Sequence, residues 1–87
     1  RRPVFIIKDI ARQDMLLCQI TRKSYEISEE IPIKKSDFIE GGLKRDSFLR
    51  VAKLFTADAS IINYKIGSLK KAKLKEAIDK ICEILTK

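Results

Sequence analysis

A cation and a hydroxyl, Arg2 and Thr21, stand at the boundaries of two apolar runs. Residues 3–7 (PVFII) are rich in β-branched and aromatic side chains, and residues 15–24 (MLLCQITRKS) begin as a nearly continuous apolar run and then become polar. These runs predict two neighbouring antiparallel strands, of which the second is buried on both faces. Because the start of one strand lies opposite the end of its antiparallel neighbour, this pairing would bring Arg2 beside Thr21.

A guanidinium held beside a hydroxyl supports a narrow range of chemistry. The chain contains no His, which excludes Ser-His-Asp and Cys-His nucleophiles, His-dependent metal sites and the His pairs that usually shuttle protons in ribonucleases. The acidic residues are scattered, so their spacing gives no support for a two-metal carboxylate site. Transesterification of RNA by its own 2′-hydroxyl remains feasible, because the substrate carries the nucleophile and an Arg can stabilise the charge on phosphorus.

The composition predicts one soluble domain with a basic surface. The 87 residues are 45% hydrophobic and 36% charged, as in globular chains, and no apolar run approaches the roughly 18 residues of a membrane span. The net charge of +7 favours polyanionic partners, nucleic acid first, although a merely solubilising surface would give the same excess. The chain begins at Arg1 with neither an initiator Met nor a signal-peptide hydrophobic region, so we expect a trimmed form of a longer protein.

The two cysteines, Cys18 and Cys82, are expected to be reduced packing residues of a cytoplasmic protein. One falls within an apolar strand and the other on a helix, and they show no CxxC spacing. No His is present to complete a zinc site. We therefore expect neither a metal nor a cofactor.

The segments around the second strand are predicted from their charges and their proline. Residues 8–13 should form a short hairpin connection that carries Arg12, and residues 22–30 a long, mobile loop. Residues 31–33 (IPI) predict an edge strand, because Pro cannot donate to a sheet ladder.

The elements further along follow from caps and turn residues. We expect Ser36 to cap a helical turn over residues 37–40, which Gly41 and Gly42 end with positive φ angles. The next predicted elements are, in order, two short strands or one bent strand over residues 47–51 and 53–56 with a break at Ala52, a helical turn over 59–62 capped by Asp58, and a strand over 63–67.

The last predicted element is an amphipathic helix that begins after Ser68 as its N-cap. Its apolar stripe is Leu74, Ile78, Ile81 and Leu85, widened by Ala77 and Cys82, and its expected ion pairs are Glu76 with Lys80 and Glu83 with Lys87. Such a helix can lie on a membrane or in a partner's groove, but docking on its own sheet is the preferred interpretation. Together the elements predict a mainly β fold with a C-terminal helix, a partly closed barrel of about five short strands.

The sequence resembles the MazF/PemK family of toxins from bacterial toxin-antitoxin modules. The motifs that carry the resemblance are, in order, RPVFII at 2–7, LCQITRKS at 17–24, GLKRDSFLR at 42–50, KLFTAD at 53–58 and KIGSL at 65–69. The resemblance implies an SH3-like barrel of the MazF/PemK/CcdB type that forms homodimers, with residues 1–87 as a single toxin domain. It also implies that the family's N-terminal strand and covering loop are missing, since nothing before Arg1 corresponds to them.

The resemblance further implies a sequence-selective, metal-independent endoribonuclease that cleaves single-stranded mRNA to 2′,3′-cyclic phosphate and 5′-hydroxyl ends. An antitoxin silences it by occupying its groove, and DNA is contacted only indirectly, through the antitoxin. The family's catalytic Arg and Thr correspond to Arg2 and Thr21. Arg50 matches a second family Arg, but Ala52 replaces the Asp that accompanies it.

The expected RNA-binding residues are Arg12, Arg22, Lys23, Ser24 and Arg50. A charged loop that is simply solvated explains Arg12, Arg22 and Lys23 nearly as well. Two alternative functions also remain open. One is a non-enzymatic toxin or binding module on the same barrel, such as a gyrase poison, and the other is a structural adaptor whose terminal helix docks on a partner.

Overall fold

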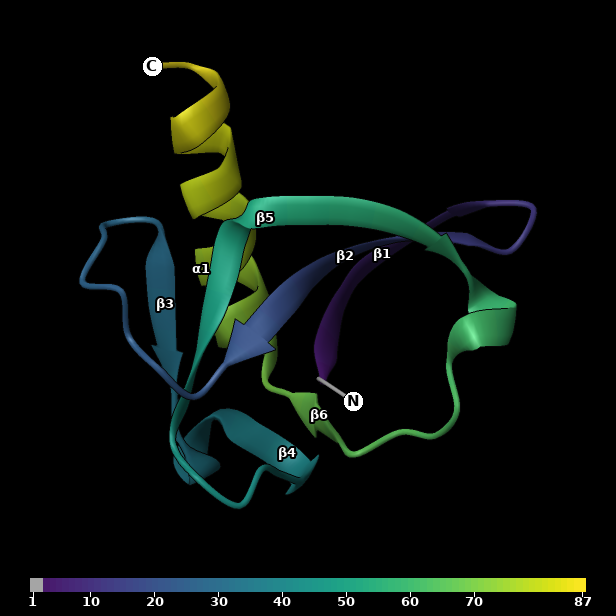
Figure 1. Ribbon diagram of the computed structural model, residues 1–87, viewed down its shortest axis with the longest axis horizontal. Helices are drawn as coiled ribbons and strands as arrows, with labels where there is room; N and C mark the ends of the chain where they lie inside the picture. Colours follow the sequence, from purple (N-terminus) through teal and green to yellow (C-terminus); the bar gives the residue numbers. More distant parts are fainter. Residues whose placement is uncertain (1–2) are drawn as a thin grey trace.

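The computed structural model describes residues 3–87, so Arg1 and the predicted catalytic residue Arg2 lie outside the described residues. The described elements are, in order, β1 (Val4–Ala11), β2 (Asp14–Thr21), β3 (Glu30–Ile33), the 3₁₀ turn η1 (Lys35–Asp37), β4 (Phe38–Gly41), β5 (Ser47–Asp58), the 3₁₀ turn η2 (Ala59–Ile61), β6 (Gly67–Leu69) and α1 (Lys71–Leu85). They form a four-stranded sheet in the order β1-β2-β5-β3 and a two-stranded sheet of β4 and β6. Figure 1 shows the larger sheet curling around the core, which confirms the mainly β fold with a C-terminal helix.

The first two strands form the predicted antiparallel hairpin, with Val4 opposite Gln19 and Ala11 opposite Asp14. The predicted connection over residues 8–13 was too long, because β1 continues to Ala11 and only Arg12 and Gln13 form the turn. Both turn residues have positive φ, 50° and 71°, as two-residue hairpin loops require. The charged residues Lys8 and Asp9 can belong to β1 because this strand lies at the edge of the sheet, where both side chains are exposed.

The prediction that the second strand is buried on both faces is confirmed. β2 lies between β1 and β5, and the consecutive residues Leu17 and Cys18, which point to opposite faces, are both 0% exposed. Cys18 and Ile20 join the core cluster with residues of β3, β5 and α1.

β5 is one continuous strand of 12 residues, so the bent-strand alternative is confirmed. Cys18 lies opposite Leu54, but the next residue, Gln19, lies opposite Arg50, so residues 51–53 have no partner on β2. This irregularity surrounds Ala52, where the sequence predicted the break. It lets β5 bend, so that its first half also pairs with the edge strand β3. The prediction of Ile31–Ile33 as an edge strand is thereby confirmed as well.

The predicted helical turn over residues 37–40 and the predicted strand over 63–67 are both wrong. Residues 38–41 form β4, which pairs with β6 at 67–69, while residues 62–66 have no regular structure. The cause is a tertiary contact that the local sequence does not show. Gly41 of β4 lies opposite Gly67 of β6, and the two backbones are so close that a Cβ on Gly67 would lie 2.6 Å from the Glu40 carbonyl oxygen. The positive φ of Gly41 and Gly42, 66° and 150°, is confirmed.

The turn after β5 agrees with the sequence. Asp58 caps η2, since its Oδ1 accepts a hydrogen bond from Ser60 N at 2.8 Å. The 3₁₀ turn spans three residues, one fewer than the predicted turn over 59–62.

The terminal helix exists, but it begins at Lys71, because its predicted cap Ser68 is part of β6. Ala77 is fully buried in the core, and Ile81 and Ile84 pack against the same cluster. Three residues of the predicted stripe, Ile78, Cys82 and Leu85, are exposed, so the buried face is narrower than the sequence indicated. The ion pairs also differ from the predicted ones, and they are Lys73 with Glu76, Lys75 with Asp79 and Lys80 with Glu83.

Lys73 joins the start of the helix to the sheet, and we predict that Lys73→Met destabilises the fold. Its Nζ donates to Pro32 O at 3.1 Å and to Glu76 Oε1 at 2.9 Å, and its side chain is only 14% exposed. The free energy of unfolding, measured by urea titration, should fall by about 1–2 kcal/mol. The control is Lys75→Met, whose exposed pair with Asp79 contributes little. Equal effects of the two variants would contradict this role of Lys73.

Burial raises the pKa of the Cys18 thiol from its ordinary value of 9.0 to about 12. The unfolded chain therefore loses this proton from about pH 9, while the folded chain keeps it until about pH 12. Since the folded state then binds more protons, stability should fall across this window by up to about 1.4 kcal/mol per pH unit. Cys18→Ala should lose this part of the pH dependence, measured by urea titration between pH 8 and 11. An unchanged slope would show that Cys18 ionises in the folded protein.

Candidate functional site

Thr21, the last residue of β2, is half-buried, and its hydroxyl is held by the following turn. Its Oγ1 accepts a hydrogen bond from Lys23 N at 3.2 Å and lies 3.4 Å from Lys23 O, to which it donates. Arg22 and Lys23 are exposed on this turn. The hydroxyl thus has a fixed position at the rim of the buried strand, with two cations directly after it.

The start of β1 lies alongside this end of β2, as the sequence predicted for the strand pair. Ile20 N donates to Pro3 O at 3.3 Å, and Val4 lies opposite Gln19. Arg2, which precedes Pro3 in the chain, lies outside the described residues, so its proximity to Thr21 stays a prediction.

The loop after Thr21 is anchored by the carboxylate of Glu30 at the start of β3. Glu30 Oε1 accepts a hydrogen bond from Ser24 Oγ at 2.9 Å, and its Oε2 accepts one from Tyr25 N at 2.8 Å. Ser24 Oγ in turn accepts a hydrogen bond from Glu26 N at 3.0 Å. Ser24, predicted to bind RNA, thus donates its hydroxyl hydrogen within the loop.

Arg50 lies on the same face of the sheet as Thr21. It stands opposite Gln19 on β2 and Glu30 on β3, while Thr21 stands opposite Phe48, two residues before Arg50. Because side chains two residues apart in a strand point to one face, the two form adjacent rows of that face. The structure therefore brings together Thr21, Lys23, Ser24 and Arg50 at one end of the sheet.

Tyr25 connects these residues. The Arg50 Cζ atom lies over its ring, 4.4 Å from the centroid, and Lys23 Nζ lies 5.8 Å from the same centroid. The Nε of Arg50 is buried and has no hydrogen-bond partner among residues 3–87. The guanidinium is thus held against an aromatic ring and not by a carboxylate.

Arg12 lies far from this cluster. It forms the turn of the β1-β2 hairpin, nine residues before Thr21, which places it roughly 30 Å away along the strand. Figure 1 shows the hairpin tip at the opposite end of β2 from its arrowhead. Arg12 therefore does not belong to the group at Thr21.

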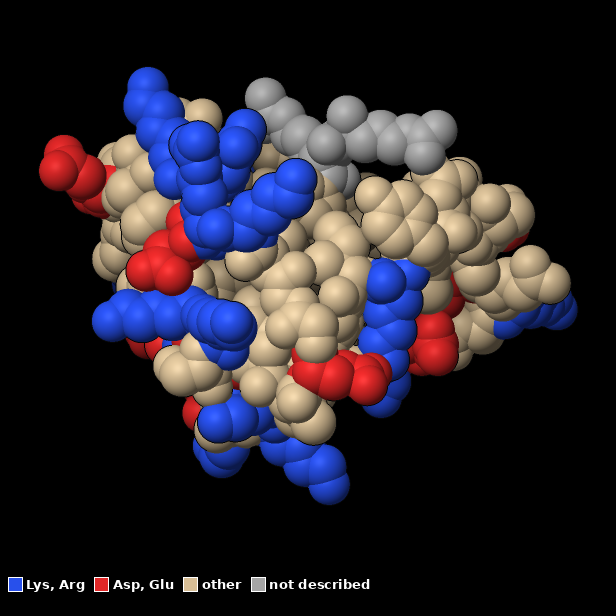
Figure 2. All heavy atoms as spheres, turned by 90° about the horizontal axis from the view of Figure 1, so that it is seen from below, with Lys and Arg blue, Asp and Glu red and all other residues tan. Residues whose placement is uncertain are grey.

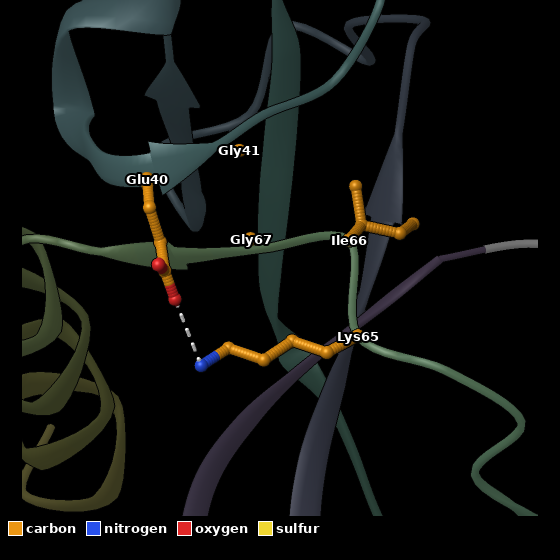
Figure 3. Close-up of a pocket in the computed structure, with 5 residues that line it drawn as sticks. All are labelled: Glu40, Gly41, Lys65, Ile66 and Gly67. Atoms are coloured by element: carbon orange, nitrogen blue, oxygen red, sulfur yellow. Dashed lines mark ion pairs between the residues drawn. The ribbon is translucent and has the colours of Figure 1, made fainter.

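Two hollows are found on the described surface, and the larger one borders Pro3 and Ile20, next to Thr21 in the sheet. A groove of about 840 Å³ runs between the start of β1 and residues 61–69, with mostly apolar walls that include Phe5, Ile20 and Tyr64. A smaller pocket of about 240 Å³ lies beside Gly41 and Gly67, where Lys65 Nζ pairs with a carboxylate oxygen of Glu40 at 3.2 Å (Figure 3). The two charged side chains that line the smaller pocket, Glu40 and Lys65, are paired with each other.

The surface charge is distributed and not confined to one patch. Figure 2 shows Lys and Arg side chains around a largely uncharged area of one face, with some acidic side chains among them. Within residues 3–87, no group of three or more His, Cys, Asp or Glu side chains is placed to hold a metal ion. No helix in that range is long and apolar enough to cross a membrane.

Tyr25 and Glu30 are the residues of this site that sequence reasoning missed. An aromatic residue inside a basic stretch, followed by an acidic pair, was a readable signal for an ordered loop. The charge of residues 22–30 by itself predicted only a mobile loop.

Comparison with known proteins gives a family and a fold. The model of the family "PemK-like, MazF-like toxin of type II toxin-antitoxin system" matches residues 1–85. One similar solved structure, "Crystal structure of Mtb toxin", shares 21% sequence identity at a TM-score of 0.72, with 94% of this chain and 90% of that chain covered. No curated protein matches the chain.

We predict that Glu30→Gln loosens the loop, because an amide has only one acceptor oxygen and cannot accept from both Ser24 Oγ and Tyr25 N through two oxygens, as the carboxylate does. Amide hydrogen exchange at Tyr25 and Glu26 should accelerate about fivefold, which corresponds to about 1 kcal/mol. Glu29→Gln is the matched control, since the Glu29 carboxylate accepts from Ser28 Oγ within the turn before β3 and holds neither Ser24 nor Tyr25. Unchanged exchange in Glu30→Gln would contradict the anchoring role.

Proposed function

Since the chain belongs to the family of PemK-like, MazF-like toxins of type II toxin-antitoxin systems, we propose that it is an endoribonuclease that cleaves single-stranded mRNA. The cleavage is metal-independent and sequence-selective. The observation that carries the proposal is the Thr21 hydroxyl, fixed at the rim of the sheet on the face that also bears Arg50. The chain's net charge of +7 favours a polyanionic substrate.

The reaction needs few protein groups. The 2′-oxygen of the ribose attacks phosphorus and loses its proton, the bond from phosphorus to the 5′-oxygen breaks, and that oxygen takes up a proton. The products are a 2′,3′-cyclic phosphate and a 5′-hydroxyl. Charge grows on the non-bridging oxygens, so fixed donors aimed at them lower the barrier.

Thr21 and Arg2 take the two roles that the reaction requires. The Thr21 hydroxyl binds a phosphate oxygen, for which it exchanges its long bond to Lys23 O for one to the substrate. Arg2 acts on the proton or on the charge that develops on phosphorus. The hydrogen bond between Ile20 N and Pro3 O supports this pairing, because it aligns the start of β1 with the end of β2.

The remaining cations hold the RNA. Arg22, Lys23 and Arg50 contact phosphates near Thr21, and Arg12 contacts the RNA at a distance from it. Arg50 serves here without the Asp of related toxins, since Ala52 occupies that position and Tyr25 supports the guanidinium instead.

The partners follow from the same family. A type II toxin implies an antitoxin, which blocks the RNA site when bound. We further propose that the chain acts as a cytoplasmic homodimer and that it reaches DNA only through the antitoxin.

The test is cleavage of a mixed-sequence RNA by the purified chain in EDTA. We expect discrete cuts with cyclic phosphate ends. Arg2→Ala and Thr21→Val should each lower the rate about 10²- to 10³-fold, the usual effect of removing one donor to a charged transition state. Thr21→Ser should retain most of the activity, because it keeps the hydroxyl.

The matched controls are Arg45→Ala and Thr56→Val, which change exposed residues of the same types elsewhere on the surface. Both should cleave like the unchanged chain. If the pure protein binds RNA but produces no new ends, it is a binding module and not a nuclease.

A further inference from the structure

Tyr25 is an exposed aromatic side chain in the middle of the cation group at Thr21. The residue is 46% exposed, although Arg50 covers one face of its ring at 4.4 Å. We infer that Tyr25 is a stacking platform for one base of the bound single-stranded RNA. The inference rests on the proposed function in one respect, namely that RNA is the ligand. It does not require the chain to cleave RNA, because a base can stack on the ring without cleavage.

The ring is held in place before any ligand binds. Glu30 fixes the backbone of Tyr25 through its amide at 2.8 Å and fixes the neighbouring residue through Ser24 Oγ. The guanidinium of Arg50, itself on a paired strand, supports the ring from one side. A base that stacks here therefore meets an ordered surface, which lowers the entropic cost of binding.

The surroundings of Tyr25 favour a nucleotide over an apolar protein segment. The ring lies next to Lys23 and Arg50, whose charges would have to lose water against an apolar partner. A nucleotide satisfies both features, because its base stacks on the ring while its phosphate pairs with the cations.

Tyr64, the second tyrosine of the chain, lies in a different environment from Tyr25. Tyr64 is 74% exposed, but it belongs to the apolar wall of the groove beside β1, where its neighbours include Ile61 and Ile66. No cation-ring contact involves Tyr64 among the described residues. The two tyrosines therefore differ in environment, and Tyr64 is a matched control.

Kinetics test the inference through a split between KM and kcat. Tyr25→Leu should raise KM for RNA cleavage about tenfold, the usual loss for one stacked base, and leave kcat within about twofold. Tyr25→Phe keeps the ring and should restore the original KM. Tyr64→Leu should leave both constants unchanged. Urea titration of each variant excludes a general loss of folding as the cause.

Fluorescence tests stacking directly, because the chain has two Tyr and no Trp. In the Tyr64→Phe variant Tyr25 is the sole emitter. A single-stranded RNA with 2′-O-methyl riboses, which cannot be cleaved, should quench this emission after correction for absorbance. Inorganic polyphosphate, which has charge but no bases, should leave the emission unchanged.

Two results would overturn the inference. One is equal quenching by polyphosphate and RNA, which would mean that the ring only senses an anion on Arg50. The other is cleavage with an unchanged KM in Tyr25→Leu, which would leave the nuclease proposal intact. Base-dependent quenching without any cleavage would support the stacking site and defeat the nuclease.

Discussion

The register of β2 is set by its side-chain pattern, and the two strands that pair with it, β1 and β5, depend on this register. Cys18 and Ile20 point into the core cluster, whereas Gln19 and Thr21 are half-buried on the other face, so a slip of one residue would turn the two polar side chains toward the core. β1 and β5 pair with β2 on its two sides and inherit its register. The end of β2, and with it the Thr21 hydroxyl, is therefore located by the core and not by the loop that follows.

The bend of β5 brings the residues of the candidate site together. Because residues 51–53 have no partner on β2, the first half of β5 turns to pair with β3 while it still lies opposite the end of β2. This places Gln19, Arg50 and Glu30 in one row across three strands. Glu30 then ties down the loop that carries Tyr25. Arg50 and Tyr25 are thus brought together by the pairing of β5 with β3 and by the hydrogen bond from Tyr25 N to Glu30.

The sequence was sufficient where a signal is local. The β1-β2 hairpin follows from two apolar runs, the edge position of β3 from Pro32, and the cap of η2 from Asp58. The pairing of β4 with β6 was not predictable, because it depends on a close approach between Gly41 and Gly67, far apart in the chain. The helix start was misplaced for the same reason, since β6 takes up Ser68. Of the proposed catalytic pair, only Thr21 lies in the described residues. Tyr25 and Arg50 lie in segments far apart in the sequence, and no periodic pattern of apolar and polar residues predicts their contact.

Distance decides which of the chain's cations can act at Thr21. At physiological salt an exposed charge is largely screened beyond about 8 Å. Arg12, roughly 30 Å along β2 from Thr21, can raise the rate at which a polyanion is captured, but it cannot stabilise charge at the hydroxyl. Lys23 belongs to the turn that holds Thr21 Oγ1, and Arg50 occupies the adjacent row of the same sheet face. The net charge of +7 is thus a property of the whole chain, whereas the proposed chemistry would depend on the few cations that the register of β2 places beside one hydroxyl.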